Sequence, residues 1–151
     1  MPVVRPATVA DIPAMMALAG HSVTAAHWSL GQYEKLFSGE NTALARRALV
    51  VSEAAGVLGF LVARVVDREW EIENIAVAGA AQRRGLGAQL LGEFLDLARA
   101  EGANAVFLEV RESNQAARAL YERWALAVSG KRARYYREPE EDALIYRLVF
   151  H

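Results

Sequence analysis

The chain has 151 residues, which is the size of one domain and is long enough to bury a core. Its composition, 54% hydrophobic and 23% charged, is typical of a globular protein and excludes an intrinsically disordered one. The net charge of −1 gives no electrostatic reason to bind nucleic acid or an anionic membrane surface, and apolar runs such as 57–66 are too short to span a bilayer.

The residue types also limit the chemistry that the chain can perform. It contains no cysteine, which excludes disulfides, a thiolate nucleophile and a cysteine-based zinc site. His21 and His27 lack metal-ligand spacing, so we expect no metal centre. No basic segment followed by an apolar stretch opens the chain, so the sequence predicts a single cytoplasmic domain over residues 1–151.

The N-terminal part predicts one strand and two helices. A short strand is expected at 3–5. Thr8 followed by Asp11 is a helix-start pattern, and the helix is expected to end at Gly20. A second helix is predicted over 29–39, where the first residue, a serine, is a suitable N-cap.

Three strands follow, over 49–53, 57–66 and 70–77, and each is rich in apolar or β-branched residues. The dipeptides Ala55-Gly56 and Asp67-Arg68 lie where hairpin turns would join these strands. The pattern therefore predicts an antiparallel meander.

The junction after the third of these strands is rich in glycine. The segment 82–88 reads QRRGLGA, and apolar residues then recur at three- and four-residue steps until Gly102 ends the predicted helix. Glycines at a strand-to-helix junction let the backbone approach an anion. The free N–H groups of the first helical turn and the helix dipole then favour a phosphate or pyrophosphate there.

Two common phosphate-binding motifs do not fit this junction. A dinucleotide fingerprint requires a third glycine where the chain has Leu90. A P-loop requires Gly-Lys followed by Ser or Thr, whereas Gly130-Lys131 is followed by Arg132. The remaining pattern is Gln-x-x-Gly-x-Gly-Ala after a strand.

The last part of the chain predicts a strand, a helix and two more strands. The strand at 105–110 is nearly all apolar, as expected for a strand buried on both faces beside a parallel neighbour. Ser113 is expected to cap the next helix. Strands at 127–135 and 143–150, joined by the polar run 137–142, complete the order β-α-α-β-β-β-α-β-α-β-β.

Two motifs carry a resemblance to a known family. The segment 82–88 resembles the acyl-CoA-binding signature of the GNAT superfamily of N-acetyltransferases, and LEVRESNQAARALYE at 108–122 resembles its second signature. With the tail at 132–148, the second signature is especially similar to bacterial alanine acetyltransferases that modify a small-subunit ribosomal protein. The chain departs from that pattern at Trp124-Ala125-Leu126, where the family has Leu-Gly-Phe.

The resemblance implies one α/β (α+β) domain, a mixed twisted sheet of about seven strands with flanking helices. The fourth and fifth strands would splay apart and hold acetyl-CoA in the gap. The residues that the resemblance assigns to the cofactor are Ile75, Ala76 and Val77 for the pantetheine arm, Arg83, Arg84, Gly85, Leu86, Gly87 and Ala88 for the pyrophosphate, and Asn114 near the reactive end.

Chemistry gives an independent reason to single out Glu109 and Tyr121. An amine must be neutral to attack a thioester, and a free α-amine has a pKa of about 8, so a nearby carboxylate can assist as a base. The departing thiolate can take a proton from a phenol. In the resembling acetyltransferases the matching Glu is the base and the matching Tyr the acid, and the N–H of Val77 would stabilise the oxyanion.

Alternatives remain for each of these residues. Glu109 can instead be a buried partner of an arginine, and Tyr121 can belong to the core. Glu71 is the main rival for the base. Glu69, Glu71 and Glu73 share one strand face unless a bulge intervenes; we expect the first to be solvated and keep a cleft role open for the other two.

The resemblance implies that Tyr135 and Tyr136, in the hairpin between the last two strands, contact the acceptor; packing within the hairpin is the alternative. The sequence therefore predicts an acetyl-CoA-dependent enzyme acting on a protein N-terminal amine, such as the alanine of a ribosomal protein. Its alternatives are acetylation of a small amine or lysine, and a non-catalytic acyl-CoA sensor. We expect no nucleic acid or membrane partner and a monomer or weak dimer.

Overall fold

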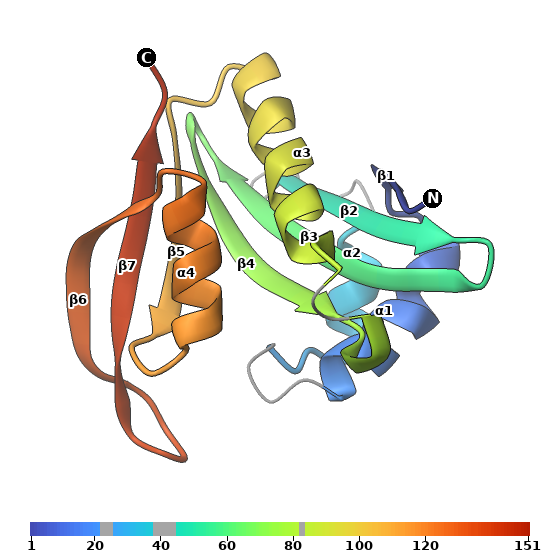
Figure 1. Cartoon of the computed structure of the whole chain (residues 1–151), viewed down its shortest axis with the longest axis horizontal. Coiled ribbons are helices and arrows are strands. Elements are labelled where there is room, and N and C mark those ends of the chain that lie inside the picture. The colour runs from blue at the N-terminus through green and yellow to red at the C-terminus, as the bar shows by residue number, and fades with distance from the viewer. Residues whose placement is uncertain (22–25, 38–44, 82–83) are drawn as a thin grey trace.

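The structure is a computed structural model that describes residues 1–21, 26–37, 45–81 and 84–151 (Figure 1). Its elements keep the predicted order, with short 3-10 turns added. They are β1 (Val3–Pro6), η1 (Val9–Asp11), α1 (Ile12–Gly20), α2 (Leu30–Lys35), β2 (Ala45–Glu53), β3 (Gly56–Val66), β4 (Glu69–Val77), η3 (Gly79–Ala81), α3 (Leu86–Ala100), β5 (Ala105–Arg111), α4 (Gln115–Arg123), β6 (Ala127–Tyr136) and β7 (Glu141–Val149).

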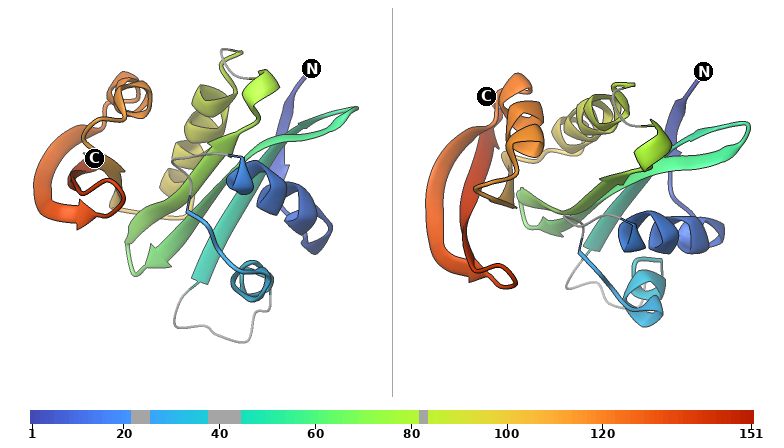
Figure 2. Two further views of the ribbon diagram at one scale, coloured as in Figure 1. Left: turned by 90° about the horizontal axis from the view of Figure 1, so that it is seen from below. Right: turned by 60° about the horizontal axis from the view of Figure 1, so that its bottom comes forward.

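The described strands form one mixed sheet of seven strands in the order β1-β2-β3-β4-β5-β7-β6. β4 and β5 are parallel and are joined by α3, whereas the other neighbours are antiparallel. Helices α1 and α2 cover one face of the sheet and α3 and α4 the other (Figure 2). The predicted fold, including the parallel crossover, is confirmed.

Each face of the sheet has its own core. Under α3, the fully buried Leu90, Leu91 and Phe94 pack on the sheet, as their spacing predicts. Under α1 and α2, Met15 and Tyr33 pack on other strand residues of the same sheet. Because both faces are covered, the central strands are held in place by packing from both sides.

The start of α2 agrees with the sequence, but its end does not. Ser29 and Gln32 form the capping box: the Ser29 hydroxyl oxygen accepts from the Gln32 N–H at 3.2 Å, and the Gln32 side chain accepts from the Ser29 N–H at 2.7 Å. The helix then stops at Lys35, so the prediction of a helix over 29–39 is too long. Gly39 lies outside the described residues.

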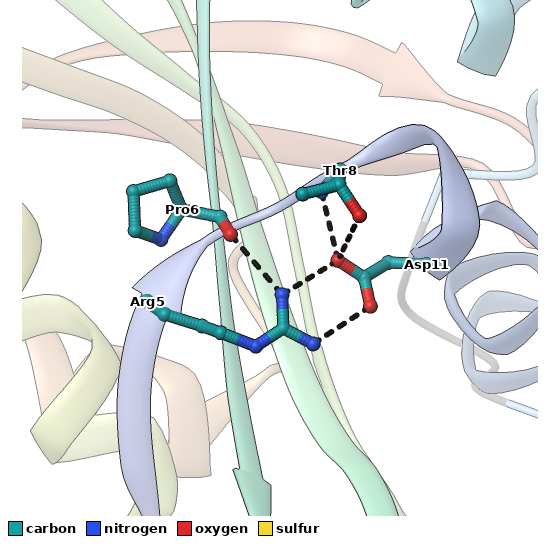
Figure 3. A network of polar contacts seen from close by, with 4 residues as sticks. All are labelled: Arg5, Pro6, Thr8 and Asp11. Carbon is teal, nitrogen blue, oxygen red and sulfur yellow. Dashed lines mark hydrogen bonds and ion pairs between the residues drawn. The ribbon is translucent and has the colours of Figure 1, made fainter.

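A buried carboxylate fastens the N-terminal strand to α1 (Figure 3). Asp11 is paired with both terminal nitrogens of Arg5 at 2.8 and 2.9 Å, and it also accepts from the Thr8 N–H at 2.8 Å. The hydrogen bonds from Arg5, opposed by burial, hold the pKa of Asp11 below its usual value. The helix-start pattern at Thr8 therefore becomes a tie between β1 and the first helix.

Helix α4 ends in a left-handed turn that is built on alanine. Ala125 has φ of 69°, its N–H bonds to the Glu122 carbonyl at 3.1 Å, and the Leu126 N–H bonds to the Tyr121 carbonyl at 3.0 Å. This is the Schellman arrangement, in which glycine is the usual residue because it has no Cβ. Ala125 therefore forms a turn in which glycine is usual, and it does so at a conformational cost.

We expect Ala125→Gly to stabilise the protein by roughly 0.5–1 kcal/mol. The left-handed conformation costs an L-residue about 1–2 kcal/mol, and the extra backbone freedom of unfolded glycine offsets only part of this gain. The measurement is urea unfolding. Ala119→Gly, an exposed change inside α4, is the matched control and should destabilise by about 1 kcal/mol. A loss of stability in Ala125→Gly would contradict the reading of this turn.

Candidate active site

The two parallel strands at the centre of the sheet pair over only part of their lengths. Glu69–Ile72 of β4 is in register with Ala105–Leu108 of β5, and no pairs follow among the described residues. β4 continues to Val77 beside β3, while β5 continues to Arg111 beside β7 (Figure 1). The expected splay is present, and it leaves one edge of β4 over 73–77 without a strand partner.

A β-bulge accompanies the point of separation. In the pairing of β4 with β3, Asn74 lies opposite Val62 and Ile72 opposite Ala63, so Glu73 is the extra residue. The bulge reverses which side chains face α3. Before it, Ile72 packs in the core under α3; after it, Ile75 does so, and Ala76 is buried on the opposite face.

The predicted pantetheine segment therefore lies along an open strand edge. Ile75 and Val77 pack their side chains on the α3 face, and Ala76 is buried on the other face. The backbone N–H and C=O groups that point toward β5 have no ladder partner there. An extended ligand with amide groups can bind such an edge as an added strand does.

Helix α3 begins where this strand edge ends. Gly85 is its N-cap, in the left-handed conformation with φ of 76°, and no side chain caps the helix. A methyl group on Gly87 would lie 3.4 Å from Cδ2 of Leu120 and 4.0 Å from Cγ2 of Val77. The first helical turn, which includes Leu86, thus lies against both β4 and α4, and its N–H groups are of the kind that can hold an anion; pyrophosphate binding there stays a prediction.

The structure describes one of the two arginines in the glycine-rich junction, Arg84. Arg84 forms an ion pair with Glu53 at the end of β2, so in the free protein its charge is directed toward another element. Arg83 lies outside the described residues. The contribution of either side chain to pyrophosphate binding stays a prediction.

The N-cap of α4 is Asn114, so the expectation that Ser113 caps this helix is wrong. The Asn114 side-chain oxygen accepts from the Ala117 N–H at 3.2 Å. Ser113 instead donates its backbone N–H to a carboxylate oxygen of Glu141 at 2.5 Å. Part of the hydrogen-bonding capacity of Asn114 is therefore used by the helix, and its predicted contact with the cofactor stays a prediction.

Glu109 lies on the face of β5 that points away from α3 and α4. Its side chain is 15% exposed, and its Oε1 is 3.4 Å from Nε of Arg132 on β6. The negative charge of Glu109 also raises the pKa of the Tyr135 phenol above its usual value. The alternative of an arginine partner is realised, although the distance is longer than the 2.7–2.9 Å of a strong charge-assisted bond.

Tyr121 is buried in the core under α4. It is 5% exposed, and its ring centre is 5.9 Å from that of Tyr146, which is fully buried. Burial raises the pKa of the Tyr121 phenol well above its ordinary value, with a smaller contribution from Tyr136. A phenol with such a pKa is fully protonated at neutral pH, as an acid must be before it donates.

Glu109 on β5 and Tyr121 on α4 lie on opposite sides of strand β5. Leu108 and Val110, which alternate with Glu109 along the strand, belong to the same core as Tyr121. No hydrogen bond or ion pair joins Glu109 and Tyr121 in the described part of the chain. Tyr136 is electrostatically coupled to both: burial and then the charge of Glu109 raise its pKa to about 12.

Arg111 holds the β6–β7 hairpin that carries Tyr135 and Tyr136. Its guanidinium donates to the carbonyls of Pro139 at 2.9 Å and Arg137 at 3.1 Å, and it lies 3.3 Å from a carboxylate oxygen of Glu141. It also lies over the Tyr136 ring, 4.4 Å from its centre. The hairpin is therefore fixed to the end of β5 beside the gap.

The glutamates of β4 are all paired. Glu71 is 2.5 Å from Arg64, and Glu73 is 2.7 Å from Arg46. Burial, partly opposed by the positive charge of Arg46, raises the pKa of Glu73. Glu69 is 45% exposed, which agrees with its expected solvated place, although it also forms an ion pair.

Sequence reasoning missed Arg132 and Tyr146. In the sequence, Arg132 is notable only as the residue that rules out a P-loop, and Tyr146 is one aromatic residue in an apolar strand. The alternation of β7 could have placed Tyr146 on the core face. Within the described ranges, no group of three or more His, Asp or Glu side chains could hold a metal ion, and no described helix is long and apolar enough to cross a membrane.

Comparison with known proteins finds partial sequence matches to N-acetyltransferases. Over 79 residues the chain is 46% identical to N-alpha-acetyltransferase RimI of Mycobacterium tuberculosis, covering 52% of this chain and 48% of that protein. Over 91 residues it is 42% identical to the ribosomal protein bS18-alanine N-acetyltransferase of Salmonella typhimurium, covering 59% and 62%. The matches thus span less than two thirds of these relatives.

Solved structures give a match over the whole fold. The ribosomal-protein-S18-alanine N-acetyltransferase from Escherichia coli has a TM-score of 0.84 and 29% identity, with 99% of this chain and 94% of that one covered. Residues 19–125 match the Acetyltransferase (GNAT) family. Because this match takes in more than half of the chain and the splayed strands and helix start lie within it, the protein belongs to the GNAT acetyltransferase family.

Proposed function

We propose that the protein transfers the acetyl group of acetyl-CoA to the α-amine of a protein N-terminus, an alanine of a small-subunit ribosomal protein being the favoured acceptor. The separation of β4 from β5 is the observation that carries this proposal. It leaves an open strand edge that leads to the uncapped start of α3, and Glu109 lies on the face of β5 that points away from this helix. The acceptor class is supported by the names of the relatives from Salmonella typhimurium and Escherichia coli.

The free strand edge and helix start fit the cofactor. The unpaired groups of β4 at 73–77 can hydrogen-bond an extended amide-containing arm, and the N–H groups at the start of α3 can hold a pyrophosphate. When bound, acetyl-CoA supplies the acyl group and a thiolate leaving group. A methyl group at position 87 would make only ordinary van der Waals contacts with Val77 and Leu120, so packing in the free protein does not by itself require glycine there.

The proposed reaction starts with the ammonium form of the acceptor. Glu109 takes a proton from it, directly or through one water, and the neutral amine then attacks the acyl carbon. The N–H of Val77 stabilises the negative charge on the acyl oxygen. As the carbon–sulfur bond breaks, the Tyr121 phenol gives its proton to the sulfur, and the nitrogen loses its second proton to water.

Tyr135 and Tyr136 are proposed to contact the acceptor. They lie at the end of β6, next to Glu109, with ring centres 5.1 Å apart in an edge-to-face arrangement. The contacts of Arg111 keep the hairpin beside the gap. Glu71 and Glu73 are proposed to face a cationic amine, although their ion pairs with Arg64 and Arg46 cancel most of the negative potential that they could offer it.

A panel of acceptors tests the proposed function. We expect acetylation of the α-amine of peptides that begin with alanine, slower reaction when the first residue is bulky, and no reaction with lysine peptides whose N-terminus is blocked or with polyamines. Mass spectrometry locates the acetyl group. Preferential acetylation of an internal lysine or of a polyamine would contradict the proposal.

Glu109→Gln should lower kcat at pH 7 by about 100-fold or more, because general base catalysis contributes about 10²–10⁴-fold. The loss should shrink as the pH rises, since more of the amine is then already neutral. Calorimetry should show acetyl-CoA affinity unchanged within about twofold. Glu140→Gln, an exposed change in the hairpin, is the charge-matched control. Equal activity in Glu109→Gln and the wild type would assign the base to Glu71 or Glu73.

Tyr121→Phe should slow acetyl transfer about 10-fold or more, because the ring still fills the core but no proton is available for the thiolate. The matched control is Tyr33→Phe, which removes a buried hydroxyl that has no hydrogen-bond partner in the described structure. That control should keep its activity and lose no stability. A Tyr121→Phe protein with the wild-type rate would assign this residue to packing alone.

A further inference from the structure

A cavity of about 330 Å³ opens next to Glu109 on the face of the sheet away from α3 and α4. Its floor is apolar and consists of Phe107 on β5, Ile145 on β7 and Val66 at the end of β3. Phe107 and Glu109 are on the same face of β5, and Ile145 lies directly opposite Glu109 in the β5–β7 pairing. The cavity is therefore continuous with the proposed base.

Because the cavity opens on one face of β5, the expectation that this strand is buried on both faces is wrong. Val106, Leu108 and Val110 are buried under the helices, whereas Phe107 and Glu109 are only half-buried because they line the cavity. The antiparallel strands β7 and β6 curve around this part of the face, and none of the described helices lies over β5 there (Figure 2). An apolar floor beside a candidate catalytic carboxylate remains open to solvent.

Two ion pairs form the walls of the cavity. Glu109 and Arg132 are 3.4 Å apart at one end, and Glu69 and Arg147 are 2.5 Å apart at the other. The four charges cancel, so the cavity has no net charge to offer a ligand. A charged side chain entering it would lose hydration and find only groups that are already paired.

An apolar or aromatic side chain fits this site better than a charged one. It would bury apolar surface against Phe107 and Ile145, worth about 25 cal/mol for each Å² removed from water. The side chains of Arg132 and Arg147 are 55% and 40% exposed. Arg132 already lies over the Tyr135 ring, 5.2 Å from its centre, and the guanidinium of Arg147 can lie in the same way against the face of a bound aromatic ring.

The length of the cavity indicates which part of an acceptor would reach it. Glu69 is in register with Ala105, four residues before Glu109, which is about 13 Å along a strand. An extended peptide advances about 3.3–3.6 Å per residue. A chain with its amine at Glu109 can therefore place its second or third residue over the cavity.

We propose that this cavity binds an uncharged apolar or aromatic side chain at the second or third residue of the acceptor, and so selects among N-terminal sequences. This inference rests on the proposed function, and it adds a specificity site formed by Phe107, Ile145 and Val66. The rest of the acceptor would continue past Glu69 and remain outside the cavity.

The test uses peptides that begin with alanine and carry Gly, Leu, Phe, Lys or Asp at position two or three. For the wild-type protein, kcat/KM should be about tenfold higher with Leu or Phe than with Gly at one of these positions, and no higher with Lys or Asp than with Gly. Val66→Trp, which fills the cavity from an exposed position, should reduce the Phe-over-Gly ratio to within about twofold.

The control variant is Val128→Trp, an exposed change on β6 outside the cavity, which should keep the wild-type ratio. Thermal unfolding and acetyl-CoA affinity, measured on both variants, should match the wild type. Equal acetylation of all the peptides, or a Phe preference unchanged by Val66→Trp, would overturn the cavity inference and leave the proposed function standing. Absence of α-amine acetylation in every peptide would overturn both.

Discussion

The interrupted pairing of β4 and β5 is the constraint on which the site depends. Parallel neighbours normally share hydrogen bonds along their whole length, but here the pairs end at Ile72 and Leu108. The bulge at Glu73 bends β4 at this point, and β7 continues to hold β5 on its other side. Unpaired backbone groups are costly when buried, so a gap of this kind persists only where a ligand or water can satisfy them.

The gap also explains how residues on two faces of a sheet can serve one reaction. The start of α3 and Tyr121 lie on the face that α3 and α4 cover, whereas Glu109 and the hairpin tyrosines, Tyr135 and Tyr136, lie on the other side. In a continuous sheet these groups would be separated by backbone. Where β4 leaves β5, a thioester entering from the helix side and an amine entering from the opposite side can meet, as the proposed reaction requires.

Local patterns predicted the elements well because their causes are local. The three- and four-residue spacing of Leu90, Leu91 and Phe94 specifies the buried face of α3, and the glycines before it mark the helix start. The resemblance of two short motifs then gave the splay, which no periodicity reveals. The choice between Ser113 and Asn114 as a cap was not decidable from the sequence, since both residue types suit that position.

Contacts between strands were harder to predict because they depend on register. Arg132 reaches Glu109 only because the β6–β7 pairing shifts on both sides of it, after Val128 and before Tyr136. The bulge at Glu73 likewise changes which side chains face α3 without any glycine or proline to signal it. The cavity beside Phe107 is lined by residues from five strands, β3 to β7, and has no sequence motif of its own.

Amide hydrogen exchange with and without acetyl-CoA tests the central claim most directly. If the coenzyme binds along the open edge of β4 and at the start of α3, the β5-facing amides within 73–77 and the amides of 85–88 should exchange rapidly in the free protein. They should become protected in the complex, while the paired segment 69–72 changes little. Binding of acetyl-CoA without protection of these two segments, or protection confined to another part of the chain, would contradict the account.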